Sequence, residues 1–207
     1  QVGREKSIMN LVQLTSDIEV REFALRALAD RKPFLEDVPL EPFFKGMKDS
    51  SERVQIAAIV GLGRLGRQEA AEMLLEVPVP ASFISPEKGQ EGPHATPNAA
   101  IIPAHLAVRA LVELEAVEAS VKAIGSENST LALWALRYMH DPRAVDGLIA
   151  AFQESRAKEA KDEGFQQKIL ATLGRLYQKE ADYDGSWWWS TRPDTHGPYY
   201  KPVKWES

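Results

Sequence analysis

The 207 residues suit a single domain, and a hydrophobic content of 44% is enough to build a continuous core. The net charge of -5 repels phosphate backbones and argues against nucleic acid as a partner. The chain has no cysteine for disulfides or thiolate chemistry, no apolar run of the ~20 residues that a membrane span needs, and no signal-peptide pattern at its N-terminus.

The main signal is an amphipathic stripe that recurs along the chain. Apolar or small residues at positions i, i+3, i+4, i+7 and i+8 are typical of a helix with one buried face. The stripes are Val20, Phe23, Ala24, Ala27 and Leu28; Val54, Ala57, Ala58, Gly61 and Leu62; Ala107, Ala110, Leu111 and Leu114; Leu131, Trp134, Ala135, Tyr138 and Met139; and Ile169, Leu170 and Leu173. The first two stripes lie 34 residues apart, which suits a repeat of two helices.

Two helix starts carry the pattern of a capping box. Ser16 stands three residues before Glu19, and Asp49 stands three residues before Glu52, each just ahead of a stripe. We therefore expect Ser16 and Asp49 to cap the helices that follow them.

Three glycines in the second stripe match a nucleotide-binding motif. Gly61, Gly63 and Gly66 have the spacing GxGxxG, which in a strand-turn-helix context binds a dinucleotide. However, residues 56–60 are in helical register with the first stripe, and no alternation of strands and helices follows. We favour the interpretation that Gly61 and Gly63 let helices approach closely and that Gly66 ends the helix in a left-handed cap.

Residues 77–103 interrupt the repeats. This stretch contains Pro78, Pro80, Pro86, Pro93, Pro97 and Pro103, and we expect it to form a long insertion between two helices. Long loops of this kind are often functional, but a merely tolerated surface insertion is the equal alternative.

A tight turn between helices is predicted at His140-Asp141-Pro142. Asp141 can cap the next helix and Pro142 suits its first position. The apolar face that follows consists of Ala144, Val145, Leu148, Ile149 and Phe152.

The sequence offers no catalytic residue, no metal ligand set and no cofactor motif. The four histidines, His94, His105, His140 and His196, include no pair at the i, i+4 spacing that brings two imidazoles to one helix face. The common hydrolase motifs and cysteine nucleophiles are also missing. We therefore expect a protein that is not an enzyme.

Residues 183–207 differ from the rest, because they hold four of the five tryptophans and three prolines. We expect an extended tail after a helical domain at residues 1–182. Its rings can pack on the last repeats and cover their apolar end, since terminal repeats need a cap. Alternatively, five rings form a platform for a ligand such as a sugar: Trp187, Trp188, Trp189, Tyr199 and Tyr200.

Residues 135–152, ALRYMHDPRAVDGLIAAF, resemble the inter-repeat turn and first helix of the HEAT-repeat family. The resemblance covers most of residues 8–178. It implies an all-α fold, an α–α superhelical solenoid of HEAT or armadillo-like type with about five helix pairs. It also implies a scaffold whose partners are proteins or neighbouring domains.

The tail supports a narrower resemblance. DGSWWWSTRPDTHGPYYKPVKWE is similar to the end of the HEAT region in large secreted proteins of planctomycetes and verrucomicrobia, which join a dehydrogenase-like propeller to a c-type cytochrome. This implies a periplasmic or secreted parent protein of several domains. The chain has no CxxCH motif, so neither haem binding nor dehydrogenase activity is implied for any residue here.

Overall fold

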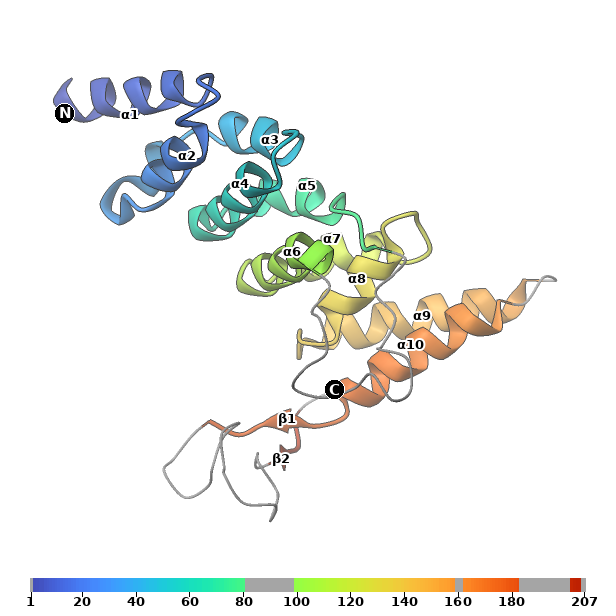
Figure 1. Ribbon diagram of the computed structural model, residues 1–207. Coiled ribbons are helices and arrows are strands. Elements are labelled where there is room, and N and C mark those ends of the chain that lie inside the picture. The colour runs from blue at the N-terminus through green and yellow to red at the C-terminus, as the bar shows by residue number, and fades with distance from the viewer. Residues whose placement is uncertain (1, 81–98, 159–161, 183–201, 206–207) are drawn as a thin grey trace, which may run out of the picture. The chain divides into compact units, whose positions relative to one another are not determined.

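The computed structural model describes residues 2–80, 99–158, 162–182 and 202–205 (Figure 1). The α-helices are α1 (Val2–Leu14), α2 (Arg21–Ala29), α3 (Glu41–Met47), α4 (Glu52–Leu65), α5 (Ala71–Leu75), α6 (Ile102–Glu113), α7 (Val117–Lys122), α8 (Ser129–Leu136), α9 (Pro142–Ala157) and α10 (Glu163–Leu176). Short 3₁₀ helices are η1 (Lys32–Asp37), η2 (Gln68–Ala70) and η3 (Ala99–Ile101), and the two strands are β1 (Lys179–Glu180) and β2 (Pro202–Val203). The predicted all-α solenoid of helical repeats is confirmed.

The chain divides into two compact units, Gln1–Ala135 and Leu136–Ser207. The predicted division at residue 182 differs from this boundary and stays a prediction, because most of residues 183–207 lie outside the described part of the chain. The predicted insertion at 77–103 is described only at its two ends. Pro103 lies in the first turn of α6, where the missing N–H of a proline costs no helical hydrogen bond.

In the first unit, α4 packs against α2, α3 and α6. The stripe predicted for this helix is fully buried, as expected for a helix with neighbours on several sides. The stripe predicted for α6 is buried as well. Two hydrogen bonds tie successive helix pairs together. Arg67 donates to the carbonyl of Val38, and Gln68 donates to the carbonyl of Leu114 beyond the end of α6.

As predicted, Gly61 and Gly63 of α4 allow close helix packing, and Gly66 ends the helix. A Cβ atom at Gly61 would lie 2.2 Å from Cε1 of Phe43 on α3, and one at Gly63 would lie 3.0 Å from Cβ of Ala110 on α6. Gly66 has φ 68° and ends the helix in the left-handed conformation that glycine adopts without strain. Helix α4 runs through the whole motif up to Leu65, so these glycines do not form a strand-to-helix turn.

The face predicted to be buried on α2 is right for Ala24 and Leu28 and wrong for Phe23. Ala24, Leu25, Leu28 and Ala29 are buried, whereas Phe23 is 60% exposed. The helix carries apolar residues on more than half of its circumference. The face centred on Leu25 is the one that is buried, because it contacts α1, α3 and α4. Tyr138, which lies beyond the end of α8, and Leu170 on α10 were also expected to be buried and are exposed.

The two predicted capping boxes are also wrong. Helix α2 begins at Arg21, after a turn in which Asp17 accepts the N–H of Glu19, so Ser16 is too far away to cap it. The N-cap of α4 is Ser51, and its N–H donates to the carboxylate of Asp49 over 2.8 Å. Asp49 therefore orders the turn before the helix and does not cap the helix itself.

The cap of α9 is confirmed. Asp141 is its N-cap, Pro142 is its first residue, and the N–H of Arg143 donates to the Asp141 carboxylate over 2.8 Å. The side chain and backbone of Arg143 lower the pKa of Asp141 below its usual value. The carboxylate is thus ionised at neutral pH, and its contribution to stability is lost as the pH falls through the lowered pKa.

In the second unit, α9 and α10 pack against each other. Ile169 and Leu176 of α10 are buried, together with Leu148 of α9. Strand β1 pairs antiparallel with β2, with Lys179 opposite Val203. Residues 202–205 therefore return to the end of α10.

Trp205 holds the C-terminal residues 202–205 against the end of α10. Its indole Nε1 donates to the carbonyl of Leu176, the last residue of α10, over 2.6 Å. The last carbonyls of a helix lack partners within the helix, so this bond satisfies an otherwise unpaired acceptor. The ring also stands edge-on to His140, with 5.3 Å between ring centroids, and His140 Nε2 donates to the carbonyl of Gln178 over 3.0 Å.

These contacts predict that Trp205 stabilises the second unit. Trp205→Phe should lower the free energy of unfolding by about 1 kcal/mol, because it removes the indole hydrogen bond and keeps an aromatic ring. Trp205→Ala should lower it by about 2–3 kcal/mol, because the packed ring is lost as well. Urea unfolding followed by circular dichroism measures both, with Lys204→Ala at an exposed neighbour as control. Equal stability of all four proteins would contradict the predicted cap at this residue.

Candidate protein-interaction surface

One stripe of exposed or half-buried side chains runs along each of three neighbouring helices of the first unit. Helix α4 contacts both α2 and α6, so the three stripes lie side by side. We call this surface the arginine face. Its residues are Phe23 and Arg26 of α2, with Asp30 just after that helix; Arg53, Ile56, Val60 and Arg64 of α4; and His105, Arg109 and Glu113 of α6.

Every arginine of this face has a carboxylate partner. The buried Glu22 binds two of them, with 2.8 Å to Nη2 of Arg26 and 2.9 Å to Nε of Arg53. The other pairs are Asp30 with Arg64, and Glu113 with Arg109 at 3.4 Å. Four guanidinium groups thus meet three carboxylates, and the face is slightly positive on a chain whose net charge is -5.

Two of these four ion pairs, Asp30–Arg64 and Glu113–Arg109, have both side chains exposed to water. The side chains of Arg53 and Arg109 are 75% and 68% exposed, and both members of the pair Asp30–Arg64 are also exposed. Such surface pairs contribute about 0–1 kcal/mol each. A partner that offers its own carboxylates can therefore replace Asp30 or Glu113 at small cost.

A groove of about 270 Å³ lies in the arginine face between α2 and α4. Ile56 and Val60 provide apolar surface, while Arg26, Asp30 and Arg64 provide charged groups. Phe23 is one helical turn from Arg26, since residues three apart on a helix are neighbours. The large exposed ring beside a groove with apolar and charged walls is a combination that protein interfaces use.

At His105, the arginine face reaches a residue of α8. The ring of His105 lies 5.9 Å from that of Trp134, centroid to centroid, in a tilted arrangement. Within the part of the chain that the structure describes, no three His, Asp or Glu side chains are close enough to hold a metal ion. None of the described helices combines the length and apolar character needed to cross a bilayer.

The predicted aromatic platform cannot be placed. Trp187, Trp188, Trp189, Tyr199 and Tyr200 all lie outside the described residues. Sequence reasoning missed the arginine face, although arginines and apolar residues at helical spacing on the exposed sides of α2, α4 and α6 were visible in the sequence. The exposed pattern of arginines was overlooked because the apolar residues of the same helices were assigned to the core.

The fold and this surface define an all-α repeat protein with an exposed face suited to macromolecular binding. Residues 7–77 match the family model of HEAT repeats, and residues 131–154 match that of the PBS lyase HEAT-like repeat. These two stretches of the chain thus match HEAT-type repeats, and HEAT repeats generally mediate protein–protein interaction. No curated protein matches the chain. One similar solved structure is the crystal structure of an engineered protein that shares 18% sequence identity with this chain. The match covers 83% of this chain and 79% of the engineered protein, with a TM-score of 0.40.

Proposed function

We propose that this chain is a non-catalytic scaffold that binds a protein partner through the arginine face. The observation that carries the proposal is the exposed ring of Phe23 on α2, one helical turn from Arg26, which lines the groove between α2 and α4. An exposed aromatic side chain costs free energy in water and recovers it when a partner covers it. Neighbouring arginines supply directed hydrogen bonds around such an anchor.

The chemistry of the face favours an acidic partner segment with at least one apolar side chain. The apolar side chain would contact Phe23, Ile56 and Val60, and carboxylates of the partner would bind Arg26, Arg64 or Arg109. The overall negative charge of the chain disfavours phosphate polymers, so the positive balance of this one face points to acidic protein segments.

We also propose that the chain acts within a larger extracytoplasmic protein, where the partner is a neighbouring domain or a second protein. This finer proposal rests on the resemblance of residues 183–207 to the ends of HEAT regions in secreted multidomain proteins. The rival proposal, oligosaccharide binding by Trp187, Trp188, Trp189, Tyr199 and Tyr200, rests on the aromatic density of the same segment.

The test is capture of proteins from extracts of the source organism on immobilised wild-type and variant chains. Phe23→Ser should lower capture of a specific partner by about tenfold or more, as expected for an aromatic anchor. Ile18→Ser is the matched control, because Ile18 is an exposed apolar residue outside the arginine face. It should leave capture unchanged.

A partner captured equally by all three proteins would contradict the proposal. If instead oligosaccharides cause a saturable change in tryptophan fluorescence and no protein depends on Phe23, the carbohydrate-binding rival takes its place. Wild-type-like melting of Phe23→Ser is the required control for folding.

A further inference from the structure

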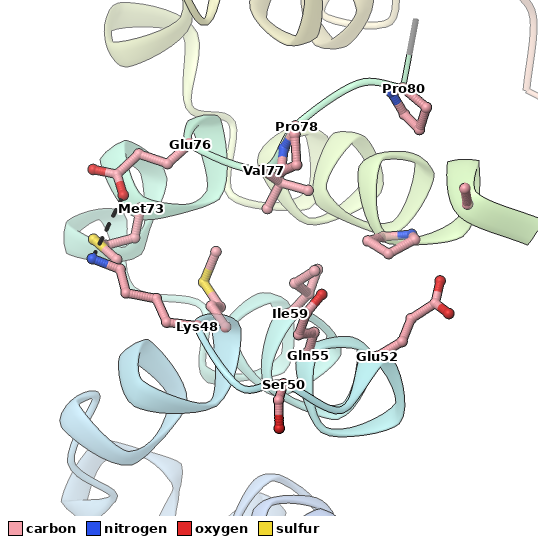
Figure 2. A pocket seen from close by; sticks show the side chains of 13 residues that line it. Lys48, Ser50, Glu52, Gln55, Ile59, Met73, Glu76, Val77, Pro78 and Pro80 are labelled. Carbon is pink, nitrogen blue, oxygen red and sulfur yellow. Dashed lines mark ion pairs between the residues drawn. The ribbon is translucent and has the colours of Figure 1, made fainter. Parts of the chain in front are cut away.

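A second cavity of the first unit lies away from the arginine face. Its volume is about 420 Å³, and we call it the edge pocket (Figure 2). It is formed by the end of α3 and the turn after it, the first half of α4, α5 with the residues that follow it, and η3 with the start of α6. None of its lining residues belongs to the arginine face.

One wall of the edge pocket is held rigidly. Asp49, in the turn between α3 and α4, binds Arg21 through both carboxylate oxygens, at 2.9 Å to Nη2 and 2.6 Å to Nε. The lining residue Gln55 donates from Nε2 to the carbonyl of Asp49 over 2.6 Å. A wall fixed in advance loses little conformational entropy when a ligand binds.

The interior of the edge pocket is mainly apolar. Met47 and Met73 line it together with Ile59, Val77 and Pro78. Ile59 and Val77 belong to the buried core, whereas both methionines are half-buried. Because methionine side chains are flexible and polarizable, they adapt to apolar side chains of different shapes.

The charged groups at the mouth are predominantly acidic. Glu52 is exposed in the first turn of α4, and among the described residues it has no ion-pair partner. Glu76 is paired with Lys48 at 4.0 Å, and both side chains are largely exposed (Figure 2). The three charged lining residues therefore leave one negative charge uncompensated within the described structure.

We propose that the edge pocket binds a peptide segment of a partner protein, which inserts one apolar side chain next to a lysine or arginine. The apolar side chain fills the space between Met73 and Ile59, and the basic group binds Glu52. The charge that this ligand carries is opposite to the charge favoured by the arginine face, so the two surfaces accept different segments.

The test is selection from a displayed library of random peptides of a dozen residues against the immobilised full chain. The enriched peptides should share an apolar residue beside a basic one. Measured by fluorescence anisotropy, Glu52→Gln should weaken their binding by about fivefold and Glu52→Lys by about 20-fold, because a charge contact is first lost and then made repulsive. Higher ionic strength should weaken binding to the wild type more than to Glu52→Gln.

Glu69→Lys is the matched control, since Glu69 is an exposed carboxylate outside the pocket and its replacement changes the net charge by the same amount. It should leave the affinity within about twofold of wild type. Phe23→Ser should also leave it unchanged, which keeps this test separate from that of the arginine face.

Three results would overturn the proposal. One is enrichment of peptides that lack a basic residue, and another is equal weakening by Glu52→Lys and Glu69→Lys. The third is that the full chain enriches no peptide while a chain without residues 82–97 does, because the pocket's occupant would then be this chain's own segment.

Discussion

Replacing Gly61 with alanine is expected to destabilise the first unit by about 2 kcal/mol, although alanine is the better helix former by about 1 kcal/mol. The new Cβ would lie 2.2 Å from Cε1 and 2.5 Å from Cδ1 of Phe43. Phe43 is fully buried, so its ring cannot move aside into solvent. Either α3 and α4 separate or the ring leaves its preferred rotamer, and both cost packing energy.

Gly174→Ala is the matched control for this prediction. Gly174 lies in α10, and a Cβ there would meet nothing within 4 Å. Alanine should raise stability at this position by about 0.5–1 kcal/mol through helix propensity alone. Urea unfolding measured by circular dichroism compares the two. Stabilisation by both substitutions would mean that α3 and α4 are not in close contact at Gly61.

Asp49→Ala is expected to lower the free energy of unfolding by about 3 kcal/mol. The side chains of Asp49 and Arg21 are only 12% and 19% exposed, so the arginine would be left without its partner in a partly buried place. The N–H of Ser51 would lose its acceptor as well. Asp49→Asn should give an intermediate loss, because the amide oxygen can still accept the Ser51 N–H.

Glu41→Ala provides the comparison, since it removes an ion pair with Lys45 whose side chains are 69% and 78% exposed. The expected loss is below about 0.5 kcal/mol, as for most exposed pairs within a helix. Equal losses for Asp49→Ala and Glu41→Ala in urea unfolding would show that the turn before α4 is not held by Asp49.

The sequence predicted those features that depend on local pattern. Helical periodicity located the repeats, and the glycine spacing in α4 was correctly assigned to helix packing because residues 56–60 shared the register of the first stripe. The cap of α9 was also predictable, since Asp141 and Pro142 act within a single turn of chain.

The predictions that were wrong concern features that depend on tertiary contacts. Helix α2 has two possible apolar faces, and only the positions of α1, α3 and α4 decide that Phe23 is the residue left in water. Asp49 was assigned to a cap because the pattern could not show that Arg21, from a distant part of the chain, would bind it. The edge pocket gathers side chains from four separate segments, and no local pattern brings these together.

We propose the arginine face as the partner-binding surface of a scaffold that contains HEAT-like repeats. Its most direct test is site-specific photo-crosslinking in extracts of the source organism, with a photoreactive residue placed at position 23 on α2, at position 109 on α6, or at position 18 in the turn before α2. We expect positions 23 and 109 to cross-link to the same protein and position 18 not to do so. Cross-linking of that protein from position 18 alone, or equally from all three positions, would contradict it.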